Sequence, residues 1–433
     1  MSVAFYRWSE TDEATKARII KRAQADIESV SEAVRPIIED VQKRGDEALR
    51  EYAKKYEKAN VRDIRVCTQE FDVAEQLLDE RIKGAITRCV RNVRRFHEEQ
   101  MRRVETHWMI EVEPGVWAGE QVTPLDSVGL YVPRGKGAFP SALYMLAVPA
   151  VIAGVKQIAI VTPPTPEGGC DAATLFTARL CGVENVYKCG GAQAIAALAY
   201  GTESVPKVCK VLGPGSPYVA AAKSLLSHVI DPGMPAGPSE SIILADESAD
   251  PDNTILDILN EAEHGEDSAA LLVTHDEKLA LYVRDHIGRV IDSLPSPHRE
   301  ICHHVMAGYG GIILTDSQDD SVAFSNLYAP EHLHLKVKNG QELLPKLKNA
   351  GEILVGEYTP SSLGNYGIGV NHVLPTGGWA RSYSCTSVWD FLKRTSISEC
   401  DQDGFVSLRD DVAILTEYEN FPAHGEVLKR RKL

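Results

Sequence analysis

Glu261 and His264 are a carboxylate and an imidazole three positions apart, a spacing that suits metal binding. The apolar residues of 254–259 favour a helix that continues to these positions, and on a helix the two side chains would share one face. A helix that supplies Glu and His in this way can hold one metal ion between them. An ordinary charged helix end has the same pattern, so the two residues alone leave both interpretations open.

Glu331 and His332 form a second candidate pair, in a segment that Pro330 opens after a helical tract. The imidazole would accept a proton from a substrate hydroxyl, while the adjacent carboxylate orients it or activates water. The same spacing is compatible with an ordinary loop. The pair is therefore a candidate for acid–base catalysis that needs support from the rest of the chain.

A glycine-rich loop at 364–376 contains Asn365 and His372 among several glycines. Such a loop combines tight backbone with polar side chains, which suits the rim of a binding site better than a core. Near the C-terminus, Glu419 and His424 flank a short segment, and their spacing fits no single helix face. By themselves these last two residues would be interpreted as part of a frayed terminus.

Two glycine turns, at 132–137 and 212–217, follow candidate strands. Glycines at such points let backbone N–H groups approach an anion at the start of a helix. The chain contains neither a Gly-x-Gly-x-x-Gly fingerprint nor a phosphate loop that ends in Gly-Lys-Ser or Gly-Lys-Thr. The pattern therefore predicts a nucleotide site with an incomplete fingerprint, and simple turns remain the alternative.

Short apolar runs alternate with helical segments through most of the chain after residue 126. Strand, helix and strand at this spacing predict parallel sheets with right-handed crossovers. Two series are present, and we predict an α/β protein with two Rossmann-like domains and helical extensions at both ends. The expected strands are 127–132, 157–162, 183–188 and 208–212 in the first series, and 241–245, 269–274, 311–314 and 352–355 in the second.

We expect the following division of the chain. Residues 127–235 form the nucleotide-binding α/β domain, and 26–126 together with 236–386 form the α/β domain that carries the metal and catalytic loops. Residues 1–25 are an N-terminal helical extension. The segment 387–433 is helical and polar, and we expect it to be exchanged between the subunits of a dimer.

The composition is that of a soluble globular protein of 433 residues, 44% hydrophobic and 25% charged. A net charge of -15, without a basic stripe before 429–432, argues against a nucleic-acid partner. We expect no signal peptide and no membrane span, so the cytoplasm is the simplest location. Nine scattered cysteines indicate reduced thiols, and Cys385 is the candidate among them for a place near the site.

Seven motifs follow one another along the chain, within a span of about 23–424. They are Tyr-Val-Pro at 131–133, the run that begins Gly-Gly-Ala-Gln at 190–202, Gly-Pro-Gly at 213–215, Ala-Gly-Pro-Ser-Glu at 236–240, Ala-Glu-His-Gly at 262–265, Tyr-Ala-Pro-Glu-His-Leu at 328–333 and Asn-His-Val-Leu-Pro-Thr at 371–376. In this order and with these gaps they resemble the histidinol dehydrogenase family. Together they are far more specific than any one of them.

The resemblance implies a zinc-dependent homodimer that oxidises L-histidinol through the aldehyde to L-histidine, with two NAD+ used in succession. It implies that His332 is the general base and that Glu331 activates the water that attacks the aldehyde. The other implied roles fall on positions that match the family. They are Glu261, His264, Asn365 and, from a second subunit, His424 for zinc; Ser239, Glu261, His264, His372 and Glu419 for the substrate; and Tyr131, Gln193 and Ser216 for the nucleotide.

Two implied zinc ligands depart from the family, because Glu261 stands where it has Gln and Asn365 where it has Asp. Each change alters the charge around the ion by one unit, and together the changes cancel. Zinc accepts two imidazoles, a carboxylate and a weaker oxygen donor in either arrangement, so we expect the metal to be retained. Near the nucleotide loop, Arg134-Gly135 replaces the usual Gly-Gly.

These departures leave the substrate open. One hypothesis is L-histidinol, and another is a different small polar amino alcohol or a diol, including the sulfonated diols that some relatives oxidise. Glu419 suits a cationic amine, but some relatives with other substrates also keep it. A third hypothesis is a catalytically silent relative retained for binding. The presence of both Glu331 and His332 argues against this third hypothesis, since a binding protein would not need that pair.

Overall fold

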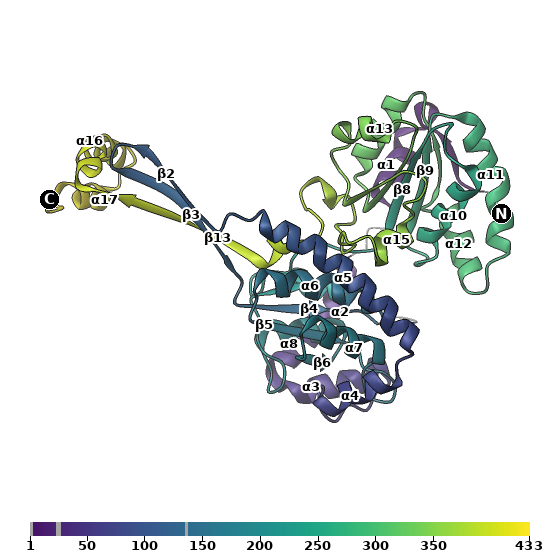
Figure 1. The fold of residues 1–433 in the computed structure, drawn as a ribbon, viewed down its shortest axis with the longest axis horizontal. Helices are drawn as coiled ribbons and strands as arrows, with labels where there is room; N and C mark the ends of the chain where they lie inside the picture. The colour runs from purple at the N-terminus through teal and green to yellow at the C-terminus, as the bar shows by residue number, and fades with distance from the viewer. Residues whose placement is uncertain (1–2, 23–26, 135–136) are drawn as a thin grey trace.

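The computed structural model describes residues 3–22, 27–134 and 137–433. Figure 1 shows two bodies of sheet and helices next to each other, and a long arm that projects away from them and carries the C-terminus. One body is built on a six-stranded sheet, the other on a four-stranded sheet, and the arm on a three-stranded sheet. Among the described helices, none is long and apolar enough to cross a membrane.

A parallel sheet forms the centre of the larger body. Its strands, in spatial order, are β1 (Phe5–Arg7), β10 (Gly311–Leu314), β9 (Ala269–Thr274), β8 (Glu240–Ala245), β11 (His332–Lys336) and β12 (Glu352–Val355). One face packs on α10 (Pro251–Ala262), α11 (Glu277–Asp292) and α12 (His298–Ala307), and the other on α1 (Glu13–Lys21) and α13 (Gln318–Tyr328). Helices on both faces explain why most of these strands are continuous apolar runs.

The smaller body has the same design around four parallel strands. In spatial order they are β6 (Val186–Lys188), β5 (Gln157–Thr162), β4 (Ser127–Tyr131) and β7 (Lys210–Leu212). One face packs on α2 (Ile27–Arg44), α3 (Asp46–Tyr52), α8 (Gly191–Tyr200) and α9 (Pro217–Leu225). The other packs on α4 (Thr68–Leu77), α5 (Glu80–Arg102), α6 (Pro140–Ala153) and α7 (Ala172–Cys181).

The arm is an antiparallel ribbon of three strands. They are β13 (Leu392–Cys400), β3 (Val116–Pro124) and β2 (His107–Glu113), with β3 in the centre. Two helices follow β13 at the far end, α16 (Gln402–Tyr418) and α17 (Pro422–Lys429). These helices expose large apolar side chains, among them Ile414 at 64% and Leu415 at 58%. An exposed apolar group of this kind is typical of a surface that another chain covers.

The predicted α/β class with two Rossmann-like sheets is confirmed, but the expected division of the chain is wrong in three places. The described part of the expected N-terminal helical extension, residues 3–22, belongs to the larger body, because β1 is an edge strand of the six-stranded sheet. Within 26–126, helices α2 to α5 pack on the four-stranded sheet, although we expected them in the other domain. The segment 387–433 is not wholly helical, because β13 pairs along its length with β3.

All eight expected strands are present, and the two parallel sheets contain β1 and β11 in addition. The sequence of β11 is His-Leu-His-Leu-Lys, an alternation that usually indicates one exposed face. All of its residues are nevertheless buried, because the polar side chains find partners inside the protein. His334 hydrogen-bonds Ser361 and Lys336 pairs with Asp257.

Candidate active site

A pocket of about 560 Å³ lies between the two bodies. On one side it is lined by Gly213 and Gly215, which follow the carboxyl end of β7. On the other side it is lined by Ser239, Glu240 and Ala269, at the amino ends of β8 and β9. The pocket therefore connects the carboxyl edge of the small sheet, where nucleotides bind in α/β folds, with the amino edge of the large sheet.

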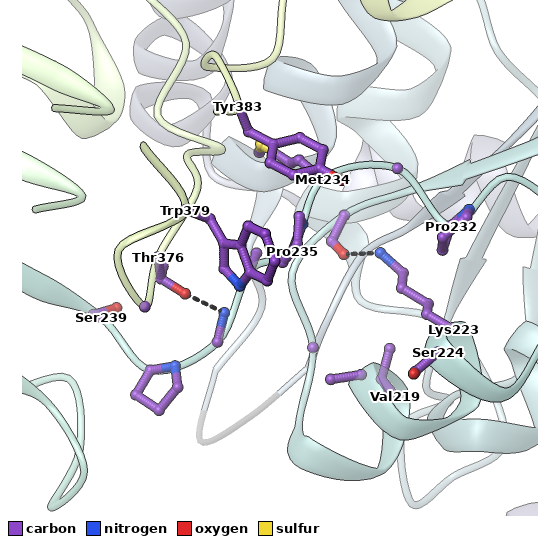
Figure 2. Close-up of a pocket in the computed structure, with 18 of the residues that line it drawn as sticks. Val219, Lys223, Ser224, Pro232, Met234, Pro235, Ser239, Thr376, Trp379 and Tyr383 are labelled. Atoms are coloured by element: carbon purple, nitrogen blue, oxygen red, sulfur yellow. Dashed lines mark hydrogen bonds between the residues drawn. The ribbon is translucent and has the colours of Figure 1, made fainter. Parts of the chain in front are cut away.

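Figure 2 shows how two walls of this pocket are built. Trp379 and Tyr383, from the loop after the glycine-rich segment, face the helix α9, which contributes Val219 and Lys223 (Figure 2). The ammonium group of Lys223 donates a hydrogen bond to the carbonyl oxygen of Gly213 at 2.7 Å. Burial lowers the pKa of Lys223 to about 8. This wall of the pocket is thus fixed by a contact between α9 and the loop after β7.

Glu331 and His332 lie at the amino end of β11, at the amino edge of the large sheet. Both are buried, with 8% and 4% of their surface exposed. The backbone N–H of Glu240 donates to Oε2 of Glu331 at 3.0 Å, and Oε1 of Glu331 is 4.0 Å from Nε2 of His332. The candidate catalytic pair is therefore brought together and held by the neighbouring strand β8.

The second ring nitrogen of His332, Nδ1, is 3.0 Å from Oε2 of Glu352 at the start of β12. Burial opposes protonation of His332, but the hydrogen bond to Glu352 and the nearby carboxylates of Glu331 and Glu261 outweigh it and raise its pKa to about 9. Burial also raises the pKa of Glu331 well above its usual value, against the effect of His332. Four titratable side chains therefore form one electrostatic cluster.

Glu261 and His264 approach each other as predicted, with Oε1 of Glu261 4.0 Å from Nδ1 of His264. The helix α10 ends at Ala262, so His264 lies in the turn after the helix and not on it. Ser239 joins this group, since its Oγ is 3.3 Å from Nδ1 of His264. Two implied ligands and an implied substrate contact are thus neighbours.

Asn365 lies on α15 (Ser361–Tyr366), which packs beside α10. The two helices are joined by a hydrogen bond of 2.6 Å from Ser362 to the side chain of Asn260. Oδ1 of Asn365 and both carboxylate oxygens of Glu261 are buried and have no hydrogen-bond partner among the described residues. Buried polar atoms are almost always paired, so unpaired oxygens on neighbouring helices are what a cation site would leave.

The residues of one chain supply only part of a metal site. Within 3–22, 27–134 and 137–433, no group of three or more His, Cys, Asp or Glu side chains is arranged to hold a metal ion. Glu261, His264 and Asn365 nevertheless offer a carboxylate, an imidazole and an amide oxygen, which suits zinc with one more ligand from elsewhere. These three side chains therefore fit zinc, but they form only part of its ligand set.

His372 is also part of the cluster. Burial lowers its pKa to about 3, and the nearby His332 and His264 contribute in the same direction. Its Nε2 is buried and unpaired within the described chain, so the neutral ring can offer a lone pair to a ligand. Cys385 does not suit a nucleophile, because burial and the nearby Asp390 and Glu352 raise its pKa to about 11.

The implied nucleotide contacts lie at the carboxyl edge of the small sheet. Tyr131 ends β4, and its hydroxyl oxygen accepts a hydrogen bond of 3.1 Å from the N–H of Gly191. Gln193, on α8, donates to Glu57 at 3.3 Å, and Ser216 is the N-cap residue of α9. Gly213 has a φ of 121°, and a Cβ there would overlap the carbonyl oxygen of Tyr131. The loop after β7 can therefore approach β4 only with glycine at this position.

Glu419 and His424 are not brought to the other site residues within one chain. Glu419 ends α16 and His424 is on α17, and both are exposed. These helices form the tip of the arm, far from α10 and α15 (Figure 1). The predicted zinc ligand and substrate contact can reach the cluster only if another copy of the chain provides them.

Three residues of the site have no role that the sequence predicts, namely Glu352, Glu240 and Arg22. Glu352 has no motif of its own, and only the pairing of β11 with β12 places it opposite His332. Glu240 belongs to a quoted motif, and its side chain forms a buried ion pair with Arg22. Arg22 and Glu240 are far apart in the sequence, so no local pattern predicts their contact.

Comparisons with known proteins identify the family of the chain. The family model described as histidinol dehydrogenase matches residues 20–432. A histidinol dehydrogenase of Synechocystis sp. is 49% identical over 95% of this chain and 95% of its own, and a histidinol dehydrogenase homolog 2 of Mesorhizobium japonicum is 49% identical over 98% and 96%. A crystal structure of histidinol dehydrogenase from Elizabethkingia anophelis has a TM-score of 0.92, with 34% identity over 99% of this chain and 97% of that chain. The chain therefore belongs to the histidinol dehydrogenase family and is an NAD-dependent dehydrogenase.

Proposed function

We propose that this enzyme uses zinc and NAD+ to oxidise L-histidinol through the aldehyde to L-histidine, as a homodimer with shared active sites. The observation that carries the proposal is the charge of the buried cluster. Glu261, Glu331 and Glu352 are all nearly inaccessible to solvent. Within the described chain, none of the three has a hydrogen bond or ion pair with a Lys or Arg.

Three buried carboxylates without a Lys or Arg partner are costly unless positive charge is supplied, and the raised pKa of Glu331 reflects this cost. The histidines of the cluster offset only part of this charge when they are protonated. A divalent cation and the ammonium group of an amino alcohol would supply the rest. An anionic substrate such as a sulfonated diol would add to the repulsion, so the cluster favours a cationic substrate.

The residues of the chain would divide the reaction as follows. Zinc, when bound, would polarise the hydroxyl group of the substrate. Nε2 of His332 would accept the hydroxyl proton, and NAD+, when bound, would take the hydride, which would give the aldehyde and NADH. Glu331 then accepts a proton from the water that attacks the aldehyde, and a second hydride passes to a second NAD+. The products are the carboxylic acid and two NADH.

The remaining ligand must come from a second subunit in this proposal. His424 and Glu419 are exposed at the tip of the arm. Among the described residues, no group of three or more His, Cys, Asp or Glu side chains completes a metal site around Glu261, His264 and Asn365. An arm that reaches across a dimer would bury His424 and Glu419 and would also supply the missing ligand to the partner's metal site. The exposed apolar side chains of α16 and α17 would be covered in the same step.

A second function within the family has support from the relatives. Proteins called histidinol dehydrogenase homologs are 49% identical in Mesorhizobium japonicum and 45% in Colwellia psychrerythraea. Together with Glu261 in place of the family's Gln, this keeps oxidation of another small alcohol as the alternative. The two functions differ in the charge that the substrate must carry.

The test is NADH formation by purified, zinc-loaded enzyme with three kinds of alcohol. We expect turnover with L-histidinol, weak turnover with a neutral diol of similar size, and none with a sulfonated diol. Turnover of the sulfonated diol without turnover of L-histidinol would contradict the charge argument and favour the alternative. Absence of turnover with every alcohol would favour a binding relative without activity.

A further inference from the structure

Glu352 lies opposite His332 because of the register of two strands. β11 and β12 are parallel, and His332 is paired with Glu352 in this register. Side chains that are paired in neighbouring strands emerge on the same face of a sheet. The backbone is also fixed at this point, since the N–H of Glu352 donates to the carbonyl oxygen of Glu331 at 2.9 Å. The contact between Glu352 and His332 is therefore built into the sheet.

The contact is buried and specific to one ring nitrogen. Oε2 of Glu352 is 3.0 Å from Nδ1 of His332, and the two side chains are 7% and 5% exposed. An ionised carboxylate only accepts hydrogen bonds, so Nδ1 must carry a proton. Nε2, the other nitrogen, lies on the side of Glu331 at 4.0 Å. In the neutral ring this arrangement leaves the lone pair on Nε2.

We propose that Glu352 is a positioning residue that holds His332 as the Nδ1–H tautomer, with Nε2 free to accept the proton of the substrate. This proposal rests on the proposed function of His332 as general base. A carboxylate that orients a catalytic imidazole in this way also stabilises the ring once it is protonated. No sequence motif includes Glu352, and none of the roles implied by the family falls on it.

Other charged groups around His332 do not replace this contact. Glu331 and Glu261 act on His332 through their charges, but within the described chain neither forms a hydrogen bond to the ring. His334 is turned to Ser361, with 2.6 Å between Nε2 and Oγ. The hydrogen bond that Nδ1–H of His332 donates to Glu352 is thus the contact that distinguishes the two ring nitrogens.

The test compares Glu352→Gln and Glu352→Ala with Glu342→Gln, a change at an exposed glutamate of the same segment. We expect kcat with the best alcohol to fall roughly 100-fold or more in both Glu352 variants, by analogy with other carboxylate–histidine pairs. KM, zinc content and thermal stability should stay close to wild type in Glu352→Gln. The acid limb of the kcat profile should move to lower pH, because the carboxylate no longer favours the protonated ring. Glu342→Gln should behave as wild type.

A second readout does not depend on turnover. NMR of 15N-histidine-labelled protein, with His332 assigned by a His332→Asn variant, reports which ring nitrogen carries the proton. The spectra are recorded above pH 9, because the pKa of His332 is raised to about 9 and the ring is neutral only above this value. Under these conditions we expect the Nδ1–H form in wild type and the appearance of the Nε2–H form in Glu352→Gln. The same tautomer in both proteins, or unchanged kcat in Glu352→Gln, would overturn the proposal. Loss of zinc from Glu352→Gln would also overturn it, because Glu352 would then be a metal ligand. A wild-type protein without turnover but with the expected tautomers would contradict only the proposed function.

Discussion

The backbone N–H of Glu240 donates a hydrogen bond to the carboxylate of Glu331, with 3.0 Å between N and Oε2. The side chain of Glu240 is held in turn by a buried ion pair with Arg22, and it accepts a hydrogen bond from the N–H of Gly377. The guanidinium of Arg22 also stacks on Tyr328, 3.5 Å from the ring centroid. Arg22, just after α1, is thereby linked through Glu240 to the predicted catalytic carboxylate of Glu331.

Arg22→Met should destabilise the enzyme and lower its activity. The change leaves Glu240 charged and buried at 2% exposure, which typically costs about 3–5 kcal/mol. We expect a lower free energy of unfolding in urea and a lower kcat at temperatures where the variant is folded. The control is Arg18→Met on α1, an exposed arginine. Equal stability of the two variants would show that the ion pair contributes nothing.

Glu261→Gln should weaken zinc binding, and the double variant Glu261→Gln with Asn365→Asp should restore it. The single change removes the carboxylate from the ligand set, whereas the double change moves it to α15. We expect at least roughly tenfold weaker affinity in the single variant, since even outer contacts to a metal ligand have effects of this size. Competition with a chelator measures the affinity.

The matched control for this prediction is Glu263→Gln, because Glu263 is half exposed and pairs with His298. Its zinc affinity should equal that of wild type. A double variant that binds zinc no better than Glu261→Gln would contradict the idea that the two departures compensate.

His264→Ala and His424→Ala should each be inactive alone, but activity should return when the two variants are combined in one dimer. In the proposed dimer, His264→Ala damages the site of its own subunit, and His424→Ala damages the site of its partner. A mixed dimer then contains one doubly damaged site and one intact site. Co-expression should give about a quarter of the wild-type activity, because about half of the dimers are mixed. If each site used its own His424, co-expression would restore nothing.

The buried His334 should make the fold sensitive to acid. Burial and the nearby His332 and Lys336 lower its pKa from 6.5 to about 3. The unfolded chain therefore binds a proton more readily than the folded one, and stability is lost as pH falls from about 6.5 towards 3. At pH 5 the loss would be about 2 kcal/mol for this residue alone.

The measurement is the free energy of unfolding in urea at pH 7.5 and at pH 5. A His334→Gln variant removes the titrating ring, so it should lose less stability between the two pH values than wild type. The control His304→Gln, at an exposed position, should show the wild-type dependence. An equal pH dependence in all three proteins would contradict the low pKa.

The alternation of apolar runs and helices is enough to predict the two parallel sheets, because buried strands between helices leave a strong local signal. It does not predict which sheet the helices α2 to α5 cover, because the apolar face of an amphipathic helix is compatible with either sheet. It also misses β11, because the buried His334 and Lys336 find their partners, Ser361 and Asp257, in distant parts of the chain.

The candidate site divides in the same way. Glu331, His332, Glu261 and His264 stand in short motifs, and the structure brings them together. Glu352 and Arg22 reach the site only through strand register and through an ion pair with Glu240. Their roles depend on distances in space that no spacing along the sequence encodes. The zinc site and the contributions of His424 and Glu419 stay predictions, because they require a metal and a second chain.

The most direct test of the proposed function is the number of NADH molecules formed for each L-histidinol consumed by the zinc-loaded enzyme, with the product identified by mass spectrometry. A complete oxidation of the alcohol to the acid transfers two hydrides, so we expect two NADH for each L-histidinol and L-histidine as the product. No NADH from L-histidinol, together with turnover of an alcohol that lacks an amine, would contradict the account.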